Sequence, residues 1–598
     1  MDYDENTGIY SALIDKENRD RYYIFRFHFG DSVVRYAVDP YANSVGMNGI
    51  VGALTDIDME DTKPLGYEYD KRPIFKNPED AIIYEMHVRD FTIDRTWGGR
   101  PELAGKYLGV VEEETKVNYK GKEYATGFDH LKDLGITHVH FLPTYDFSST
   151  DESRARDKDV RNWGYDPENY NVPEGSYSMN PKNPKSRIIE YRKMVMKLHK
   201  AGIRVINDVV YNHMASTENM DCIVPGYYFR SKRDGSYSDD SACGNAVESR
   251  RPMIRKFIID SLKHWIKDYR TDGFRFDLMA ILDTTTMNLI KKELKNLDPS
   301  LLIYGEPWMA APSPLSDGKQ TNKDKGIAYF NDVFRDAVRG DNHPEKSKGF
   351  VTGDFIKNPI VCNGINSSGK EPKYMINYAE AHDDYTIWDQ IEKNQNPDID
   401  PSQYRQNIPE DVLSDIRVRK ALLANAIMIL SQGIPFFQGG SEILRTKHGD
   451  SNSFRSSDWV NKFDWIGKGQ FLPVFNYYKG LIELRKAHPA FRLTSVLQVK
   501  KYQYVKRLQD KDNIIYQYLK HNVGGDDFKD IFILYNASDK REHINCLPKN
   551  GDWKVIANHE RVDLKKPIEI ISPIKDMGTG RYDFYIEPYS LMIMYNND

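Results

Sequence analysis

The chain has 598 residues, which is too long for one ordinary hydrophobic core and predicts two to four domains. Hydrophobic residues make up 40% and charged residues 29%, a globular balance that excludes long disorder, and no apolar run approaches a membrane span. The formal net charge of −5 excludes a basic footprint for nucleic acid or an anionic membrane.

Aromatic and cysteine content bear on the ligand and the compartment. Phe, Trp and Tyr make up 12% of the chain, which favours a carbohydrate ligand because rings stack on sugars, although core packing is the alternative. The four cysteines form no CxxC pair, so we expect neither a zinc site nor a disulfide framework; a Cys222–Cys243 pair across a loop is the alternative. The polar, acidic start lacks the apolar core of a signal peptide, so we expect a cytoplasmic protein, or a secreted one whose signal has been removed.

The first predicted unit, residues 1–75, has strand texture. The stretches "RYYIFRFHFG" and "SVVRYAVDPYANSVGMNG" alternate apolar and polar residues and end at Gly or Pro turns. The segment is short for a free-standing sandwich. We therefore expect a partial, starch-binding-like β-sandwich module that rests on its neighbour.

The second predicted unit, residues 76–488, alternates short apolar runs with helical patterns that often end in Gly. Such alternation predicts a (β/α)8 TIM barrel. The eight strand candidates are residues 81–88, 138–143, 204–210, 273–279, 301–308, 327–335, 374–382 and 434–440. Residues 489–598 return to strand texture and predict a C-terminal antiparallel β-sandwich. The expected fold class is therefore α/β, a barrel with a short N-terminal β module and a C-terminal sandwich.

Polar side chains gather at the carboxyl ends of the predicted barrel strands, where such barrels carry their chemistry. Taken singly, each has a structural alternative as a helix cap, a solvated loop residue or a hydrogen-bonded core group. Four strands contributing to one mouth favour a catalytic cluster. Its members are Asp208, Asn212, His213, Arg275, Asp277, Glu306, His382 and Asp383.

The carboxylates of this cluster predict separate roles. Arg275 and Asp277 are two residues apart on one strand and point the same way, so Arg275 is expected to keep Asp277 ionised, as a nucleophile requires. Glu306 has no adjacent cation in the sequence and is the better proton donor. Retaining glycosidases hold such a pair about 5–5.5 Å apart. Adjacent strands, about 4.8 Å apart, make that separation attainable.

Four segments, "DVVYNH", "GFRFDLM", "YGEPW" and "AEAHDD", resemble in this order the signature regions of the alpha-amylase family (glycoside hydrolase family 13). The resemblance implies that Asp277 is the nucleophile, Glu306 the acid/base and Asp383 the third carboxylate, which holds sugar hydroxyls.

The same resemblance implies roles for the remaining cluster members. Arg275 would set the ionisation of Asp277. His213 and His382 would bind the sugar just before the cut, and Asp208 would be a structural support. Asn212 matches a calcium ligand of many relatives, but no complete set of six to eight oxygens can be assembled, and structural hydrogen bonding is the alternative. We expect no required cofactor, with calcium as an optional ligand.

The stretch "NWGYDP" after the second strand resembles the "YNWGYDP" hallmark of type I pullulanases, the α-1,6 debranching subgroup of this family. Residues 39–49, 329–340 and 441–465 resemble that subgroup too. Tyr165 would then stack on the glucose at the cut. The other residues implied to shape or extend the site are Asn162, Trp163, Asp166, Trp308 on the acceptor side, and Asp458 and Asn461 at the next glucose.

Two residues depart from the subgroup pattern. Arg161 stands where the hallmark has Tyr, and Asp384 stands where the subgroup has Asn after "HD". Asp384 adds a negative charge beside Asp383, which is expected to raise the pKa of one of the pair or to alter subsite contacts. Neither departure touches the nucleophile or the acid.

These observations predict a monomeric retaining hydrolase that cleaves α-1,6-glucosidic linkages in pullulan and branched α-glucans or limit dextrins. Its partner is an α-glucan oligo- or polysaccharide, with no nucleic acid and no membrane. An isoamylase-like or glycogen-debranching α-1,6-glucosidase is the alternative among enzymes; the "NWGYDP" stretch disfavours an α-1,4-cutting neopullulanase. A non-catalytic glucan-binding barrel is the alternative from another class. Retention of all three carboxylates disfavours it.

Overall fold

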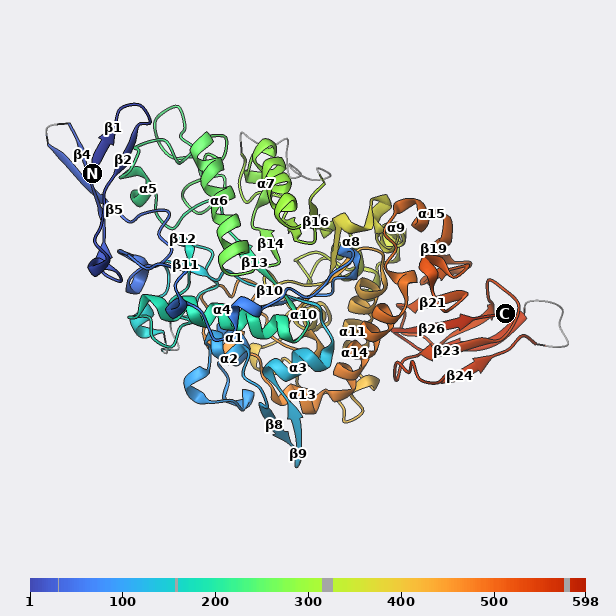
Figure 1. The fold of residues 1–598 in the computed structure, drawn as a ribbon. Coiled ribbons are helices and arrows are strands. Elements are labelled where there is room, and N and C mark those ends of the chain that lie inside the picture. The colour runs from blue at the N-terminus through green and yellow to red at the C-terminus, as the bar shows by residue number, and fades with distance from the viewer. Residues whose placement is uncertain (31, 156, 158–159, 314–325, 575–580) are drawn as a thin grey trace.

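The computed structural model describes all residues except 31, 156, 158–159, 314–325 and 575–580. The chain is elongated, with the N-terminal strands at one end, a barrel in the middle and an antiparallel sheet at the other end (Figure 1). Both expected β regions therefore flank the barrel.

Eight parallel strands close into a barrel, as the sequence predicts. They follow one another around it in chain order, and the last strand pairs with the first through Phe436 and Ile83. Every residue in these strands is buried, which explains why they read as continuous apolar runs. The strands are β7 (Ile83–Met86), β10 (His138–Phe141), β13 (Arg204–Val209), β14 (Gly273–Phe276), β15 (Leu302–Gly305), β16 (Ala328–Phe330), β17 (Met375–Tyr378) and β18 (Ile434–Gln438).

Helices surround the barrel and have recognisable ends. In α4 (Pro184–Lys200), the Asn183 side chain accepts a hydrogen bond from the Lys185 amide, and Gly202 just beyond the helix has a φ of 78°. The other helices of seven or more residues are α3 (Gly127–Leu134), α6 (Pro252–Asp268), α7 (Thr284–Leu297), α8 (Asp332–Arg339), α9 (Asn358–Ile365), α10 (Ile387–Gln395), α11 (Ile416–Leu430), α14 (Leu472–Ala487) and α15 (Val496–Tyr502). Shorter ones are α1 (Val88–Thr92), α2 (Tyr107–Val110), α5 (Glu218–Asp221), α12 (Asp458–Asn461) and α13 (Ile466–Gln470).

Residues 1–75 contain the expected strands as three two-stranded sheets. Part of this segment contacts the loop that follows β10. The carbonyl of Gly49 accepts a hydrogen bond from Asn169 at 3.0 Å, and a Cβ on Gly49 would lie 2.3 Å from Asp146. The strand pairs are β1 (Asp2–Asp4) with β2 (Ile9–Ser11), β3 (Tyr22–Tyr23) with β6 (Gly52–Ala53), and β4 (Phe25–Phe29) with β5 (Val33–Ala37).

Two further hairpins lie in the loops that follow the first two barrel strands. They are β8 (Lys116–Tyr119) with β9 (Lys122–Ala125), and β11 (Tyr145–Phe147) with β12 (Pro167–Pro173). The second hairpin carries the hallmark stretch between its strands. Both hairpins lengthen these loops beyond those of a minimal barrel.

The C-terminal region forms a six-stranded antiparallel sheet that packs on the barrel and on a separate strand pair. Alternate residues face opposite ways: Ile533 belongs to the core shared with the barrel, while Leu534 faces the pair. This confirms the predicted sandwich. The six strands, in sheet order, are β19 (Gln503–Leu508), β20 (Lys511–Leu519), β21 (Asp530–Asn536), β26 (Ser590–Asn596), β23 (Trp553–Ala557) and β24 (Glu569–Ile571); the pair is β22 (Glu542–Cys546) with β25 (Arg581–Ile586).

The described residues contain neither a membrane-spanning helix nor a disulfide bond. Within the described residues, no helix has the length and apolar character that crossing a bilayer requires. All four cysteines are free thiols, so the alternative Cys222–Cys243 pairing is not formed.

Candidate active site

The register of β14 and β15 places two of the predicted carboxylates side by side. Phe276 pairs with Gly305 in the ladder, and Asp277 and Glu306 are the next residues along each strand. The Glu306 amide donates to the Phe276 carbonyl at 3.0 Å. Both carboxyl groups therefore leave the same end of two neighbouring strands.

Arg275 is the charge centre of the site. Its Nη1 bonds Asp208 Oδ1 at 2.9 Å and Asp277 Oδ1 at 3.0 Å, and its Nη2 bonds Glu306 Oε1. The sequence predicted the Asp277 contact, but Glu306 also has Arg275 as a partner, because the neighbouring strand brings it within reach. Glu306 is held on its other oxygen by the Leu278 amide at 3.0 Å.

The carboxyl groups nevertheless differ in acidity in the predicted order. Burial raises the pKa of Glu306 to about 8, against the opposing effect of Arg275. Burial likewise raises the pKa of Asp277 to about 6, and Asn212 limits the rise by donating to its Oδ2 at 2.7 Å. Burial opposes ionisation of Asp208 too, yet Arg275 holds its pKa at about 2. Glu306 is therefore the group that retains a proton at neutral pH.

The pKa values of the two predicted histidines are shifted in opposite directions. Burial lowers the pKa of His213 to about 4, and its Nε2 donates to the Tyr165 carbonyl at 2.8 Å. Burial opposes charge on His382 as well, but Asp383 and Glu85 raise its pKa to about 9. Its Nδ1 donates to Glu85 Oε1 at 2.8 Å, so His382 is a cation at neutral pH.

The hallmark loop lies directly over this cluster. The Tyr165 hydroxyl donates to Asp208 Oδ2 at 2.7 Å, and its ring stacks on His382 with centroids 5.1 Å apart. Trp163 is buried edge-on against the same imidazole at 4.8 Å. The loop is thus fixed by the groups that it covers, which orients the exposed part of the Tyr165 ring toward the cavity.

Arg161, the departure from the hallmark, has a clear structural partner. Its guanidinium forms two hydrogen bonds of 2.7 Å with the carboxylate of Asp90, and a third with the Ser453 carbonyl. Both charged groups are buried. Arg161 therefore anchors the hallmark loop to α1 and to the loop after β18.

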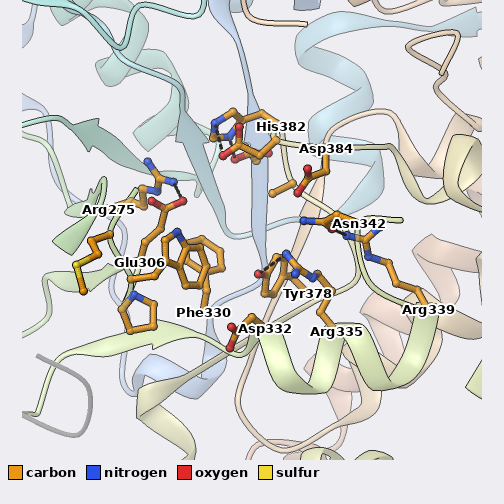
Figure 2. Close-up of a pocket in the computed structure, with 16 residues that line it drawn as sticks. Arg275, Glu306, Phe330, Asp332, Arg335, Arg339, Asn342, Tyr378, His382 and Asp384 are labelled. Atoms are coloured by element: carbon orange, nitrogen blue, oxygen red, sulfur yellow. Dashed lines mark hydrogen bonds and ion pairs between the residues drawn. The ribbon is translucent and has the colours of Figure 1, made fainter. Parts of the chain in front are cut away.

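Two cavities open beside the cluster. The first, which we call the aromatic cavity, has a volume of about 510 Å³. Its lining includes Asn162, Trp163, Tyr165, Asp166, His213, Asp277, Asn452 and Phe454. The second, the arginine cavity, has a volume of about 410 Å³ and is lined by Arg275, Phe330, Asp332, Arg335, Arg339, Asn342, Tyr378 and Asp384 among others (Figure 2). Glu306, Trp308, His382 and Asp383 border both cavities.

The predicted residues are distributed unevenly between the two cavities. Glu306 lies where the cavities meet, whereas Asp277 borders only the aromatic cavity. All four hallmark-loop residues predicted for the site line that same cavity. In a bound chain that spans the junction, the bond that lies next to Glu306 would therefore be flanked by two different surfaces.

Two of the residues predicted to contact glucan do not line either cavity. Both Asp458 oxygens accept hydrogen bonds of 2.8 Å from Arg89. Asn461 is buried, and its side chain bonds Ser453 at 2.8 Å and neighbouring carbonyls. The prediction that these two contact the next glucose stays a prediction.

Sequence reasoning missed several residues that support the site. Glu85, on β7, fixes His382 but lies nearly 300 residues from it in the chain. Lys447 is buried, and its Nζ donates to the His382 carbonyl at 2.8 Å and to the Asp384 carbonyl at 2.5 Å. Only the fold brings these residues together. The "RTKHGD" stretch that contains Lys447 carries no signal in the sequence beyond its resemblance to the subgroup.

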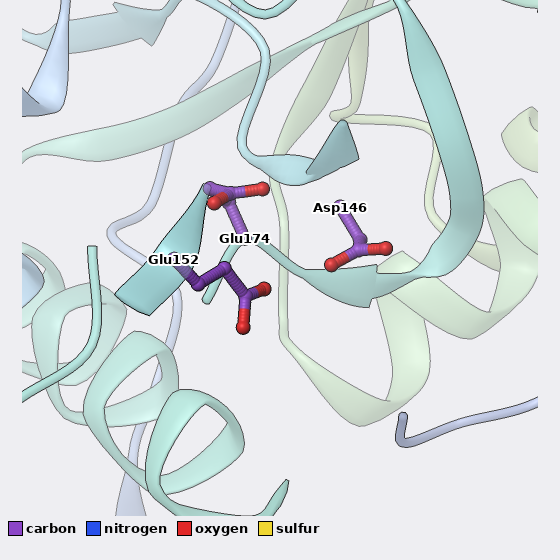
Figure 3. A group of neighbouring side chains, drawn as sticks. All are labelled: Asp146, Glu152 and Glu174. Atoms are coloured by element: carbon purple, nitrogen blue, oxygen red, sulfur yellow. The ribbon is translucent and has the colours of Figure 1, made fainter. Parts of the chain in front are cut away.

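A separate group of carboxylates lies beside the hallmark loop. Asp146, Glu152 and Glu174 are buried and close enough together to hold a metal ion, and they are the one such group among the described residues (Figure 3). Arg187 already binds Asp146 at 2.9 Å and Glu152 at 2.8 Å. The guanidinium supplies the positive charge that a metal ion would bring to these two groups. Asn212, the ligand considered from the sequence, instead donates to Asp277.

Comparison with known proteins identifies the group to which the site belongs. Residues 125–223 match the alpha amylase catalytic domain, and residues 503–561 match the pullulanase all-beta domain. The chain is 36% identical to a pullulanase of Bacillus subtilis (strain 168), over 97% of this chain and 78% of that protein. The chain belongs to the pullulanase group of the alpha-amylase family.

Solved pullulanase structures share its fold. A pullulanase from Bacillus acidopullulyticus superposes with a TM-score of 0.87 and 37% identity, over 97% of this chain and 68% of that one. A pullulanase from Paenibacillus barengoltzii, in complex with maltohexaose and alpha-cyclodextrin, gives a TM-score of 0.85 and 37% identity, over 96% of this chain and 86% of that one. The barrel, the hallmark loop and the C-terminal sheet are thus features of a pullulanase-group enzyme.

Proposed function

We propose that the chain is a retaining glycoside hydrolase that cleaves α-1,6-glucosidic linkages in pullulan and in branched α-glucans or limit dextrins. The observation that carries the proposal is the junction of the two cavities at Glu306, with Asp277 on the side covered by the hallmark loop. A debranching enzyme must hold two glucan chains that meet at one bond. The aromatic cavity would take the donor chain and the arginine cavity the chain that is released.

Glu306 and Asp277 divide the chemistry in this proposal. Glu306 keeps its proton at neutral pH and donates it to the glycosidic oxygen. Asp277 attacks the anomeric carbon, and the bond to the leaving oxygen breaks with its electron pair on that oxygen. Water, deprotonated by Glu306, then attacks the glucosyl–Asp277 ester and releases the sugar with its configuration retained.

The surrounding residues would bind and orient the donor glucose. The part-exposed ring of Tyr165 offers a stacking surface, and the imidazolium of His382 a hydrogen-bond donor. Asp383 is more than half exposed at the junction, where its carboxylate can accept hydrogen bonds from sugar hydroxyls. Trp308 borders the arginine cavity and would contact the released chain.

We infer that the enzyme requires no cofactor, because the acid, the nucleophile and the sugar ligands all come from this chain. Calcium, if bound, would serve stability alone. We propose a monomer that acts in the cytoplasm, in keeping with its free cysteines and with a site complete within one chain.

Product analysis tests the function. The purified chain is incubated separately with pullulan and with amylose, and the oligosaccharides are separated by chromatography. Maltotriose from pullulan with amylose intact is the expected result. Panose, or shortened amylose, would mean α-1,4 cleavage and would overturn the proposed linkage specificity.

An isoamylase-like specificity is the alternative and is less supported, because the chain is 28% identical to isoamylase 3 of Oryza sativa subsp. japonica but 36% identical to the Bacillus subtilis pullulanase. Branched glycogen as a third substrate separates the two. An isoamylase-like enzyme would debranch glycogen while leaving pullulan nearly untouched.

A further inference from the structure

The arginine cavity contains an acidic side chain whose hydrogen-bonding capacity is unused. Asp384 lines this cavity together with Arg335 and Arg339 of α8. Within the described part of the chain, its carboxylate accepts no hydrogen bond and forms no ion pair, although its backbone carbonyl is held by Lys447. A carboxylate left open in a polar cavity can accept hydrogen bonds from a ligand.

The backbone directs this carboxylate into the cavity. Asp384 has a φ of 62°, in the left-handed region that Asp and Asn adopt more readily than other side chains. Lys447 fixes the peptide by donating a hydrogen bond to the Asp384 carbonyl. Figure 2 shows the side chain directed toward the space that Tyr378 and Asn342 also border.

The rest of the cavity wall suits a sugar chain. The rings of Trp308 and Phe330 lie 6.4 Å apart and supply apolar surface. Arg335 is anchored by Tyr378 at 3.0 Å, and Arg339 has Nε and Nη1 buried without hydrogen-bond partners. The wall thus combines rings, fixed cations and an open carboxylate, the groups that recognise adjacent sugar hydroxyls.

We propose that Asp384 is a specificity-determining residue that accepts hydrogen bonds from hydroxyl groups of the glucan chain released by cleavage. This rests on the proposed function, in which the arginine cavity takes that chain. An ionised carboxylate is acceptor-only, whereas the Asn of the subgroup pattern presents one acceptor and one donor group. Asp384 therefore favours substrates that place vicinal hydroxyls, both donating, beyond the cut.

Two variants and two substrates test the inference. Asp384→Gly removes the side chain at a left-handed position that Gly accepts without strain, and Asp384→Asn keeps its shape. Pullulan places glucoses in the arginine cavity. α-Maltotriosyl fluoride, whose leaving group is a single atom, reports on donor binding and bond cleavage alone.

We expect Asp384→Gly to lower kcat/KM on pullulan by about tenfold or more, mainly through KM, because a hydrogen bond to a charged group is lost. On α-maltotriosyl fluoride, the kcat/KM of Asp384→Gly should stay within about twofold of that of the parent. On pullulan, the kcat/KM of Asp384→Asn should lie between those of the parent and Asp384→Gly. Asp398→Asn, which removes one charge at an exposed site away from the cavities, is the control and should match the parent.

Two results would overturn the inference. Equal losses on both substrates would mean that Asp384 acts through neighbouring Asp383 on the chemistry, and unchanged kinetics on both would mean that it contacts no substrate. A parent enzyme that hydrolyses the fluoride but not pullulan would instead overturn the proposed function, and this inference with it.

Discussion

At the scale of single residues, the acidity of the carboxyl groups in the site depends on how they share the guanidinium of Arg275. Arg275 pairs with Asp208, Asp277 and Glu306, yet the pKa of Asp208 is about 2 and that of Glu306 about 8. Asp208 also accepts hydrogen bonds from Tyr165 and His140, which stabilise its charge. Glu306 has fewer such partners, so burial dominates.

These pKa values predict a bell-shaped profile. The reactive state needs ionised Asp277, with a pKa of about 6, and protonated Glu306, with a pKa of about 8. We expect kcat/KM on pullulan to fall below about pH 6 and above about pH 8, as measured by initial rates. Because the two groups interact, the pKa values that the acidic and basic limbs of the profile report belong to the pair and not to either residue alone. A profile that stays flat up to pH 10 would contradict the assignment of Glu306 as the acid.

Glu306→Gln should lower kcat on pullulan by a factor of about 10²–10⁴, since proton donation to the sugar oxygen is lost. The same variant should form the glycosyl ester from α-maltotriosyl fluoride at near the parent rate, because fluoride leaves without a proton. Mass spectrometry of the trapped ester on Asp277 checks this. Asp277→Asn is the matched control and should form no ester from either substrate.

Arg161→Tyr should destabilise the fold even though it restores the hallmark residue. The change removes two 2.7 Å hydrogen bonds from the buried Asp90 carboxylate, which keeps Arg445 at 3.5 Å and His87 at 3.2 Å, at a cost of about 2 kcal/mol. Urea denaturation measures this loss. Asp90→Asn in the same background should recover part of it, and an unchanged midpoint for Arg161→Tyr would show that other groups satisfy Asp90.

At the scale of elements, strands were more predictable than loops. The eight barrel strands could be located because each is a buried apolar run, and polar residues at their ends identified the three catalytic candidates. Loop contacts could not be predicted in the same way. Glu85 reaches His382 because barrel closure places β7 next to β18 and so one strand away from β17, and Lys447 reaches Asp384 because β17 and β18 are neighbours in the barrel.

Lys447 links the loops that follow β17 and β18. Lys447→Met should remove both hydrogen bonds to the loop that carries Asp383 and lower kcat more than it raises KM, because Asp383 would lose its fixed position. Steady-state kinetics on pullulan and limited proteolysis of residues 380–386 measure this. Lys447→Arg keeps a donor and should retain more activity; equal loss in both variants would point to packing alone.

At the scale of the whole molecule, the comparisons and the fold agree on the enzyme group, and the structure adds the charge balance of the acidic cluster near the hallmark loop. The sequence left Asn212 open as a calcium ligand or a hydrogen-bonded structural residue; in the structure it donates to Asp277, while Arg187 lies beside Asp146 and Glu152. The sequence could not separate these roles, because a buried arginine and a metal ion satisfy similar acidic clusters and only geometry tells them apart.

Chelation should therefore leave turnover unchanged. After dialysis against EDTA, the rate on pullulan at 25 °C should match that of the untreated enzyme within error, since no metal is needed by Glu306 or Asp277. Added Ca²⁺ serves as the control. A loss of rate that Ca²⁺ restores would show that a cation supports the active conformation.

The two cavities that meet at Glu306 also bear on the reverse reaction. In the proposed function each product occupies its own cavity, so both would remain bound at once while Asp277 and Glu306 stay in place. By microscopic reversibility, the same groups then catalyse condensation when products are concentrated and water is scarce. In a concentrated maltooligosaccharide syrup, this debranching site would become a tool for grafting side chains onto α-glucans.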